Sequence, residues 1–465
     1  MAFLLRWISR KAAVGSRTWN PASRSPTNFG GGYKGGRMMS SVATSTSIPP
    51  WLMLPPSVVV EDNNKNNKNM VYKFYSLADD KIISLNKRGG EAIEIESPDD
   101  ESELKGSSHG WLALFDPRNC DLFLSNPLSR RHIKLPPIHN LPIPEENLEG
   151  GYGCVNNVII SCSPDEEECR AMMTFGPTDR LAFCCPGRRS TEWTPIGEPF
   201  ETDEDGRRTP RSCESFVYSS TEKLFYCVIG YGEFEAWDLQ DPSSPRCTLM
   251  DVSADEKNYP WAGRSEEELK LKIMCRPLTC LVVDSSSGQL YHVTRHVMEH
   301  MAPDGSYVDC FDEGSDMCPY KTIGFDVHKY DPESSALKYM EGSLDGMAFF
   351  IGNNHSFAMR ASAFPELKPN SIYFTDLDEL IPHRVRTPNP PFGGHDIGIF
   401  NYEDGTFSPC YYPYDNWVVK HFRLSPTLTE LVFSNNLLSG KLPDPSSLSN
   451  LQLLDLSLFR IASFA

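Results

Sequence analysis

Short apolar segments that recur in groups constrain the fold of this chain more than any other feature. Five groups of short alternating segments, separated by turn residues, begin near positions 110, 157, 214, 278 and 346. Segments of five to eight residues with a period of two predict β-strands. About four such strands at a pitch of 47 to 68 residues are typical of β-propeller blades, in which neighbouring sheets bury each other's faces. With two further strand-like segments upstream, "MVYKFYSL" and "DKIISL", we expect an all-β propeller of about six four-stranded blades.

Composition and charge exclude several classes of protein. The chain has 465 residues and a net charge of −18, which argues against a nucleic-acid partner because such proteins usually carry a basic stripe. No segment approaches the 18 consecutive apolar residues of a membrane-spanning helix, so we expect no membrane span. The 14 cysteines form no C-x-x-C pair, which favours free thiols in a reducing compartment over a disulfide framework.

The first 60 residues differ from the rest, because they contain no Asp or Glu and many Arg and Ser residues. The opening "MAFLLRWISRKAAV" alternates apolar and basic residues as an amphipathic helix does. This composition is typical of an organellar transit peptide, and it favours a mitochondrion over a chloroplast. A basic tail without a targeting role is the alternative. The targeting residues that we expect are Arg6, Arg10, Lys11, Arg17, Arg24 and Arg37.

Four segments follow from these patterns. Residues 1–40 are the expected transit peptide, and residues 41–69 are a linker that ends in the low-complexity run "EDNNKNNKN". Residues 70–423 hold the expected propeller, and residues 424–465 form a leucine-rich tail. The acidic stretch "ESPDDESELK" before the first group is expected to be a loop.

Three motifs carry a resemblance to a known family. They are "GSSHGWLALFDPRNCDLFLSNPLSRRHIKLPP" from Gly106, a longer stretch from Phe325 to Asp376, and "HDIGIFNYEDG" from His395. In this order they resemble the plant KIB-type β-propeller family, also called domain of unknown function 295. The resemblance implies a kelch-like propeller that binds proteins. Many members begin with an F-box that docks a ubiquitin ligase, whereas this chain lacks that pattern and resembles a branch with organellar targeting.

The C-terminal tail resembles a different architecture. Residues 428–443 are similar to the plant leucine-rich repeat, and leucines restart the pattern 23 residues later. The pattern then breaks at Phe459, after about one and a half repeats. Since a solenoid needs at least about three repeats to bury its leucines, we expect no self-standing recognition arch. The resemblance to the propeller family ends after about His421, so the closure of the ring is an open question.

Two patterns suggest catalytic or metal chemistry, and the residues around them argue against both. "GSSHG" matches the nucleophile motif G-x-S-x-G with Ser108 as nucleophile, but a strand follows where that motif needs a helix. His292, His296 and His300 share one face of a strand, yet neighbouring histidines would lie about 13 Å apart, too far for one ion. No phosphate-binding loop or dinucleotide fingerprint is present in the sequence. We therefore expect no catalytic residue, no metal site and no cofactor.

A non-enzymatic protein-interaction module in an organelle is the function that these observations favour, with a protein partner whose identity and stoichiometry the sequence leaves open. The alternative is an F-box-type substrate receptor for a ubiquitin ligase in the cytosol or nucleus. A third hypothesis, an enzyme with a site at the propeller centre, has the least support.

Overall fold

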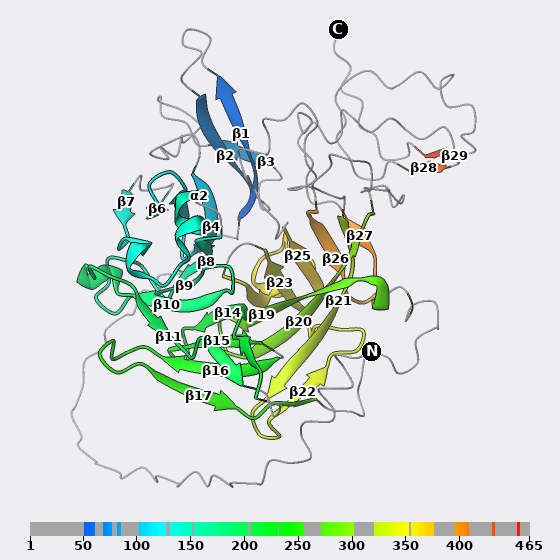
Figure 1. Ribbon diagram of the computed structural model, residues 1–465. Coiled ribbons are helices and arrows are strands. Elements are labelled where there is room, and N and C mark those ends of the chain that lie inside the picture. The colour runs from blue at the N-terminus through cyan, green and yellow to red at the C-terminus, as the bar shows by residue number, and fades with distance from the viewer. Residues whose placement is uncertain are drawn as a thin grey trace, which may run out of the picture. The chain divides into compact units, whose positions relative to one another are not determined.

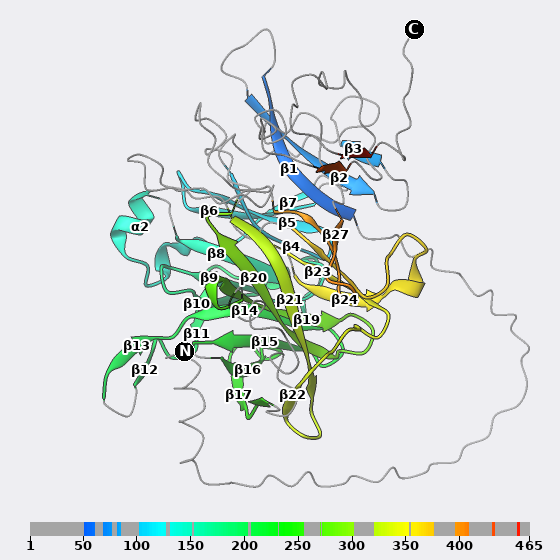
Figure 2. The ribbon, with the colours of Figure 1, turned by 90° about the vertical axis from the view of Figure 1, so that its right-hand side faces the viewer.

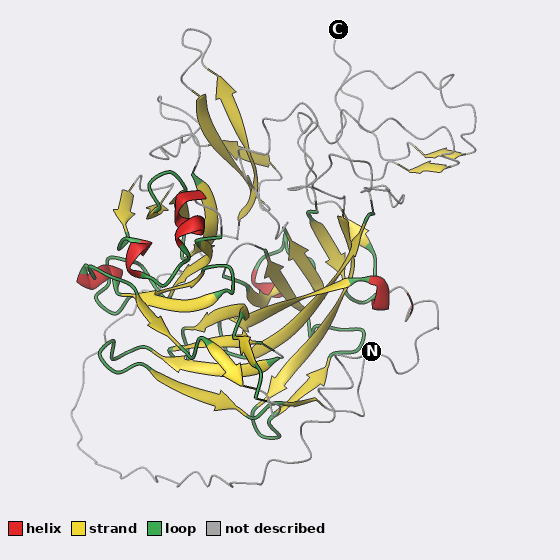
Figure 3. Cartoon of the chain, viewed as in Figure 1, coloured by secondary structure: helices red, strands yellow, loops and turns green. Residues whose placement is uncertain are grey.

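The computed structural model consists almost wholly of short β-strands (Figures 1 and 3). The chain divides into two compact units, residues 1–408 and 409–465. The helical turns of the first unit are short: η1 (Ile138–Asn140), α2 (Glu145–Gly150), η2 (Pro186–Arg188) and η4 (Ala361–Ala363). The described residues are 51–60, 68–76, 81–84, 102–126, 131–150, 153–202, 206–230, 232–254, 270, 272–301, 320–352, 355–375, 396–408, 430–432 and 453–455.

Blade 1 is an antiparallel meander in the order β4-β5-β6-β7. Its strands are β4 (Glu103–Ser108), β5 (Trp111–Asp116), β6 (Asp121–Asn126) and β7 (Arg131–Lys134). The prediction of a loop over "ESPDDESELK" is therefore wrong in its last three residues, because β4 begins at Glu103. The acidic composition hid this strand, in which the buried Glu103 is neutralised by Lys105 at 2.8 Å.

Blades 2 and 3 repeat the same meander at the expected positions. Blade 2 consists of β8 (Val155–Ile160), β9 (Ala171–Phe175), β10 (Arg180–Cys184) and β11 (Thr194–Ile196). Blade 3 consists of β14 (Cys213–Ser219), β15 (Leu224–Ile229), β16 (Glu233–Asp238) and β17 (Arg246–Met250). The chain between the two blades forms a separate hairpin of β12 (Phe200–Thr202) and β13 (Arg208–Pro210), which projects from the blades in Figure 2.

Blades 4 and 5 are joined in one ten-stranded sheet. Blade 4 comprises β19 (Arg276–Asp284), β20 (Leu290–Glu299), β21 (Tyr320–Asp331) and β22 (Ala336–Tyr339), with the short β18 (Ser253–Ala254) parallel to β22. Blade 5 comprises β23 (Met347–Ile351), β24 (Phe357–Arg360), β25 (Ser371–Phe374), β26 (Gly398–Asn401) and β27 (Phe407–Ser408). A parallel pairing of β19 with β24 connects the two blades.

The hydrophobic core lies between neighbouring blades, as the propeller prediction requires. One cluster joins blades 1 and 2 through residues such as Phe115 and Met173, and the next joins blades 2 and 3 through Phe183 and Phe225. Two further clusters lie between blades 3 and 4 and between blades 4 and 5. Each sheet therefore buries a face that it could not bury alone.

Hydrogen bonds connect the inner segments of different blades. The backbone N–H of Ile160 in β8 donates to Ser108 Oγ in β4 at 2.9 Å, and the N–H of Leu281 in β19 donates to Ser215 Oγ in β14 at 2.8 Å. The N–H of His355, just before β24, donates to the carbonyl of Ser107 in β4 at 2.8 Å. This bond connects the residue before β24 in blade 5 with the first strand of blade 1.

Gly106 marks the closest approach between two of these strands. Its φ is +150°, and a Cβ atom there would lie 2.1 Å from the carbonyl oxygen of Val158 in β8. No side chain fits at that distance, so glycine is required for blades 1 and 2 to meet.

The all-β propeller predicted from the sequence is confirmed. The described strands form four blades of four strands, a fifth of five strands, and an upstream antiparallel sheet of β1 (Trp51–Val60), β2 (Lys68–Ser76) and β3 (Lys81–Ser84). The two upstream segments "MVYKFYSL" and "DKIISL", which brought the expected number of blades to about six, correspond to strands β2 and β3.

In the second unit, β28 (Glu430–Val432) pairs in parallel with β29 (Leu453–Asp455). Leu431 pairs with Leu454, which is the 23-residue spacing at which the leucine pattern restarts. The leucine-rich resemblance itself stays a prediction.

Candidate functional site

Ser108, the residue of the G-x-S-x-G pattern, lies at the end of β4 and is 9% exposed. Its Oγ accepts the backbone N–H of Ile160 from the neighbouring blade. The turn at His109 and Gly110 follows directly and leads into strand β5. Ser108 therefore connects two blades, and the strand–turn–helix context of a nucleophile elbow is missing at this position.

The three histidines of "HVTRHVMEH" are spaced along and just beyond one extended strand, so they do not converge on one point. His292 and His296 lie on β20, and His300 follows the strand at a φ of +61°. The His292 ring lies opposite that of His328 on β21, with ring centroids 6.1 Å apart, and burial lowers the pKa of His292 to about 3. Among the described residues, no group of three or more His, Cys, Asp or Glu side chains could hold a metal ion.

His296 belongs to a buried polar cluster that the sequence did not predict. Its Nε2 lies 2.7 Å from Asp326 Oδ2, and Lys272 Nζ contacts both oxygens of the same carboxylate at 2.6 and 2.7 Å. Burial would raise the pKa of Asp326, but the hydrogen bond with His296 and the charge of Lys272 outweigh it and lower the pKa to about 2. All these groups converge on one carboxylate, which is typical of a structural ion-pair network.

His355 lies where blades 1, 3 and 5 meet. Its backbone N–H donates to the carbonyl of Ser107 in blade 1 at 2.8 Å, while its ring atom Nε2 accepts the backbone N–H of Tyr218 in blade 3 at 3.0 Å. Burial, together with the neighbouring His109, lowers the pKa of His355 to about 4. The backbone of His355 therefore contacts blade 1, and its neutral imidazole connects blade 5 to blade 3 at neutral pH.

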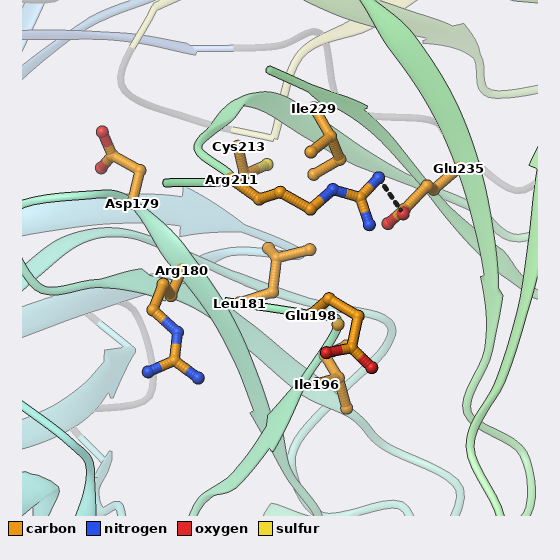
Figure 4. Close-up of a pocket in the computed structure, with 10 residues that line it drawn as sticks. Asp179, Arg180, Leu181, Ile196, Glu198, Arg211, Cys213, Ile229 and Glu235 are labelled. Atoms are coloured by element: carbon orange, nitrogen blue, oxygen red, sulfur yellow. Dashed lines mark ion pairs between the residues drawn. The ribbon is translucent and has the colours of Figure 1, made fainter. Parts of the chain in front are cut away.

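Figure 4 shows a small pocket between blades 2 and 3, lined by charged and apolar side chains. Arg211 Nη2 contacts Glu235 Oε1 at 2.9 Å and Glu233 Oε2 at 3.1 Å, and Glu235 also accepts the indole N–H of Trp237 at 2.9 Å. The pocket holds about 20 Å³, little more than one water molecule. This volume suits the tip of one partner side chain better than a metabolite. Its lining residues are Asp179, Arg180, Leu181, Ile196, Gly197, Glu198, Arg211, Cys213, Ile229 and Glu235.

The β12–β13 hairpin begins and ends beside this pocket. The Phe200 ring is 44% exposed, and the guanidinium carbon of Arg208 lies 4.5 Å from its centroid. The hairpin is held at its base by the N–H of Arg211, which donates to the carbonyl of Pro199 at 3.1 Å. Aromatic residues and arginine are both enriched in protein interfaces relative to the rest of the surface. The sequence shows only a short run of charged residues here, so this surface was missed.

The expected targeting residues Arg6, Arg10, Lys11, Arg17, Arg24 and Arg37 lie outside the described residues. Within the part of the chain that the structure describes, no helix is long and apolar enough to cross a membrane.

Similar proteins agree with this architecture. A family model described as the KIB1-4 beta-propeller matches residues 74–401. An F-box protein of Arabidopsis thaliana is 35% identical over 91 residues, which are 19% of this chain and 18% of that relative. The match thus spans less than a fifth of the relative's length.

Two solved structures are similar to this chain at low sequence identity. A member of the DUF4221 family from Bacteroides vulgatus is 13% identical, with 63% of this chain and 86% of that chain covered and a TM-score of 0.31. The β-propeller domain of Cps50 (Swd1) from Myceliophteria thermophila is 9% identical, with 62% and 84% covered and a TM-score of 0.26. Because both TM-scores lie below 0.5, the assignment depends on the family model alone. That model covers more than half of the chain and encloses β3 to β26, and so this chain belongs to the KIB1-4 beta-propeller family.

Proposed function

We propose that this protein is a non-enzymatic protein-interaction module, and that it acts in an organelle, with the mitochondrion first and the chloroplast second. The observation that carries the interaction function is the β12–β13 hairpin. It presents the exposed Phe200 and Arg208 beside a pocket that fits one side-chain tip. Loops and hairpins positioned by a rigid scaffold are the usual sites of protein recognition.

The hairpin is suited to docking because strands β12 and β13 are already paired with each other. Thr209 Oγ1 donates to Glu201 Oε1 at 3.2 Å across the two strands, and Phe200 pairs with Pro210 in the ladder. A preformed contact surface loses little conformational entropy on binding. A partner that covers Phe200 would also remove its exposed apolar area from water.

Proximity labelling in intact cells tests the interaction function. The full chain should label a reproducible set of proteins, and the double variant Phe200→Ala/Arg208→Ala should lose them. Leu249→Ala on β17 is the matched control, since Leu249 is 62% exposed outside the hairpin. An unchanged set of labelled proteins in the hairpin variant would show that the partner binds elsewhere, and the absence of any reproducible set would contradict the interaction function.

The organellar location is supported by the acid-free, basic composition of the first 60 residues. A fluorescent protein fused behind the full chain should co-localise with mitochondria. Replacing Arg6, Arg10 and Lys11 with Ser should return the signal to the cytosol, because import depends on the positive charge of the leader. A diffuse signal from the unmodified chain would contradict the organellar location.

The similarity to an F-box protein favours the second candidate, a substrate receptor for a ubiquitin ligase in the cytosol or nucleus. Co-purification of the full chain with ubiquitin-ligase subunits would support it. Mitochondrial import without such subunits would favour the first candidate.

A further inference from the structure

The loop between β8 and β9 brings two cysteines face to face. In the ladder Ile160 pairs with Ala171, and the N–H of Ser161 donates to the carbonyl of Arg170 at 2.9 Å. The next pair in this register is Cys162 and Cys169. Cys169 Sγ lies 3.4 Å from the carbonyl oxygen of Cys162.

This position suits a disulfide. Ser161 donates its backbone N–H to the Arg170 carbonyl, while the Arg170 N–H donates to Ser161 Oγ at 2.9 Å. Continued by one residue, this register places Cys162 opposite Cys169 at a position of the non-hydrogen-bonded kind. Opposite residues at such positions have Cα atoms about 4.5 Å apart, which is inside the range that a disulfide spans without moving the backbone, about 4.4 to 6.8 Å.

We propose that Cys162 and Cys169 form a redox site, which a hydroperoxide oxidises to a disulfide across the base of this loop. The Cys162 thiolate attacks one peroxide oxygen, so that the O–O bond breaks, Cys162 becomes a sulfenic acid and the first water (or alcohol) leaves. The Cys169 thiol then attacks the Cys162 sulfur, the S–S bond forms, and the hydroxyl leaves as a second water with the thiol proton. The two sulfurs are oxidised by two electrons in total, and the peroxide is reduced by two.

Exposure distinguishes this pair from Cys120 and Cys154. Cys162 is partly exposed, whereas Cys120 and Cys154, which contact each other, are both buried. Peroxide can therefore reach Cys162 first, and Cys169 is the resolving thiol behind it. Burial raises the pKa of both thiols, that of Cys169 to about 12, so both steps are slow at neutral pH.

The loop that the disulfide would close connects three blades. Its acidic residues form ion pairs with Arg131 of blade 1, with Arg188 of blade 2 at 3.7 Å, and with Lys223 of blade 3 at 3.8 Å. The carbonyl of Glu166 also packs against Gly187, where a Cβ atom would lie 2.0 Å away. Oxidation therefore fixes the base of a segment that spans neighbouring blades.

The test uses the full chain, reduced and then treated with hydrogen peroxide. Free thiols are blocked, the disulfide is reduced, and the newly released thiols are labelled with a second reagent and located by peptide mass spectrometry. The second label should appear on Cys162 and Cys169 together, with the loss of two hydrogens in the intact mass, and dithiothreitol should reverse both changes. The oxidised protein should melt at a higher temperature than the reduced one.

Variants separate this site from the other thiols. Cys162→Ser and Cys169→Ser should each abolish the second label, and Cys120→Ser is the matched control that should leave it unchanged. Cys169→Ala provides a second test should the serine variant fail to fold. The proposal would be overturned if the second label appeared only on other cysteines. It would also be overturned if Cys162 gained the mass of oxygen and no disulfide formed.

Discussion

Removing the carboxylate of Asp396 should lower the free energy of unfolding more than removing a charged side chain from the surface. Arg295 of β20 is 1% exposed, and its Nη2 contacts Asp396 Oδ2 at 2.7 Å. The same carboxylate accepts the Thr322 hydroxyl at 2.5 Å, while Arg295 Nη1 donates to the carbonyl of Thr375 at 2.8 Å. These contacts join blade 4 to blade 5.

The magnitude follows from burial. Removing one partner leaves a buried charge uncompensated, which costs about 3 to 5 kcal/mol. In a domain of more than 300 residues 1 kcal/mol corresponds to roughly 1.4 °C, because the entropy of unfolding grows with size, so Asp396→Ala should lower the melting temperature by about 4 to 7 °C. Arg295→Met should have a similar effect, and the double variant should be less destabilised than the sum of the two.

Differential scanning calorimetry or circular dichroism against temperature measures this effect. The matched control is Glu299→Ala, which removes an ion pair with Arg276 whose side chains are 53% and 44% exposed. That change should cost about 1 kcal/mol or less. If Asp396→Ala moved the melting temperature no further than Glu299→Ala, the buried pair would not stabilise the junction of blades 4 and 5.

Two more predictions concern the inner strands. Gly106→Ala should cost at least about 2 kcal/mol in chemical denaturation, because the new Cβ would overlap the Val158 carbonyl, whereas Gly176→Ala, with open space around it, should cost only the strain of its positive φ. His355 has a lowered pKa in the folded state, so its contribution to stability is full above about pH 6.5 and falls as the pH drops to about 4, by up to about 1.4 kcal/mol per pH unit. His355→Gln should therefore shift acid unfolding to lower pH, and the exposed His139→Gln should not.

Clear outcomes would contradict each of these. Equal denaturation midpoints for the Gly106 and Gly176 variants would show that the first two inner strands can separate without loss. An unchanged acid-unfolding curve in His355→Gln would show that this imidazole does not titrate on unfolding.

The sequence by itself determined the strands and their grouping. The expected second, third and fourth blades coincide with the observed sheets, because each alternating segment carries its own period-two pattern and its own turn residues. The motifs that resembled the KIB-type family lie within the matched region. Strand β4 was missed, since its charges resemble those of a loop until Lys105 and Glu103 are seen to pair.

Only the tertiary structure decided which residues meet. Asp326 and Lys272 are 54 positions apart, and Asp396 and Arg295 are 101 apart, so no local pattern announces either pair. The same holds for His355, which reaches Tyr218 across 137 positions. Local periodicity specifies a strand and its faces, whereas contacts between blades depend on how the sheets stack around the ring, and that arrangement exists only in the folded chain.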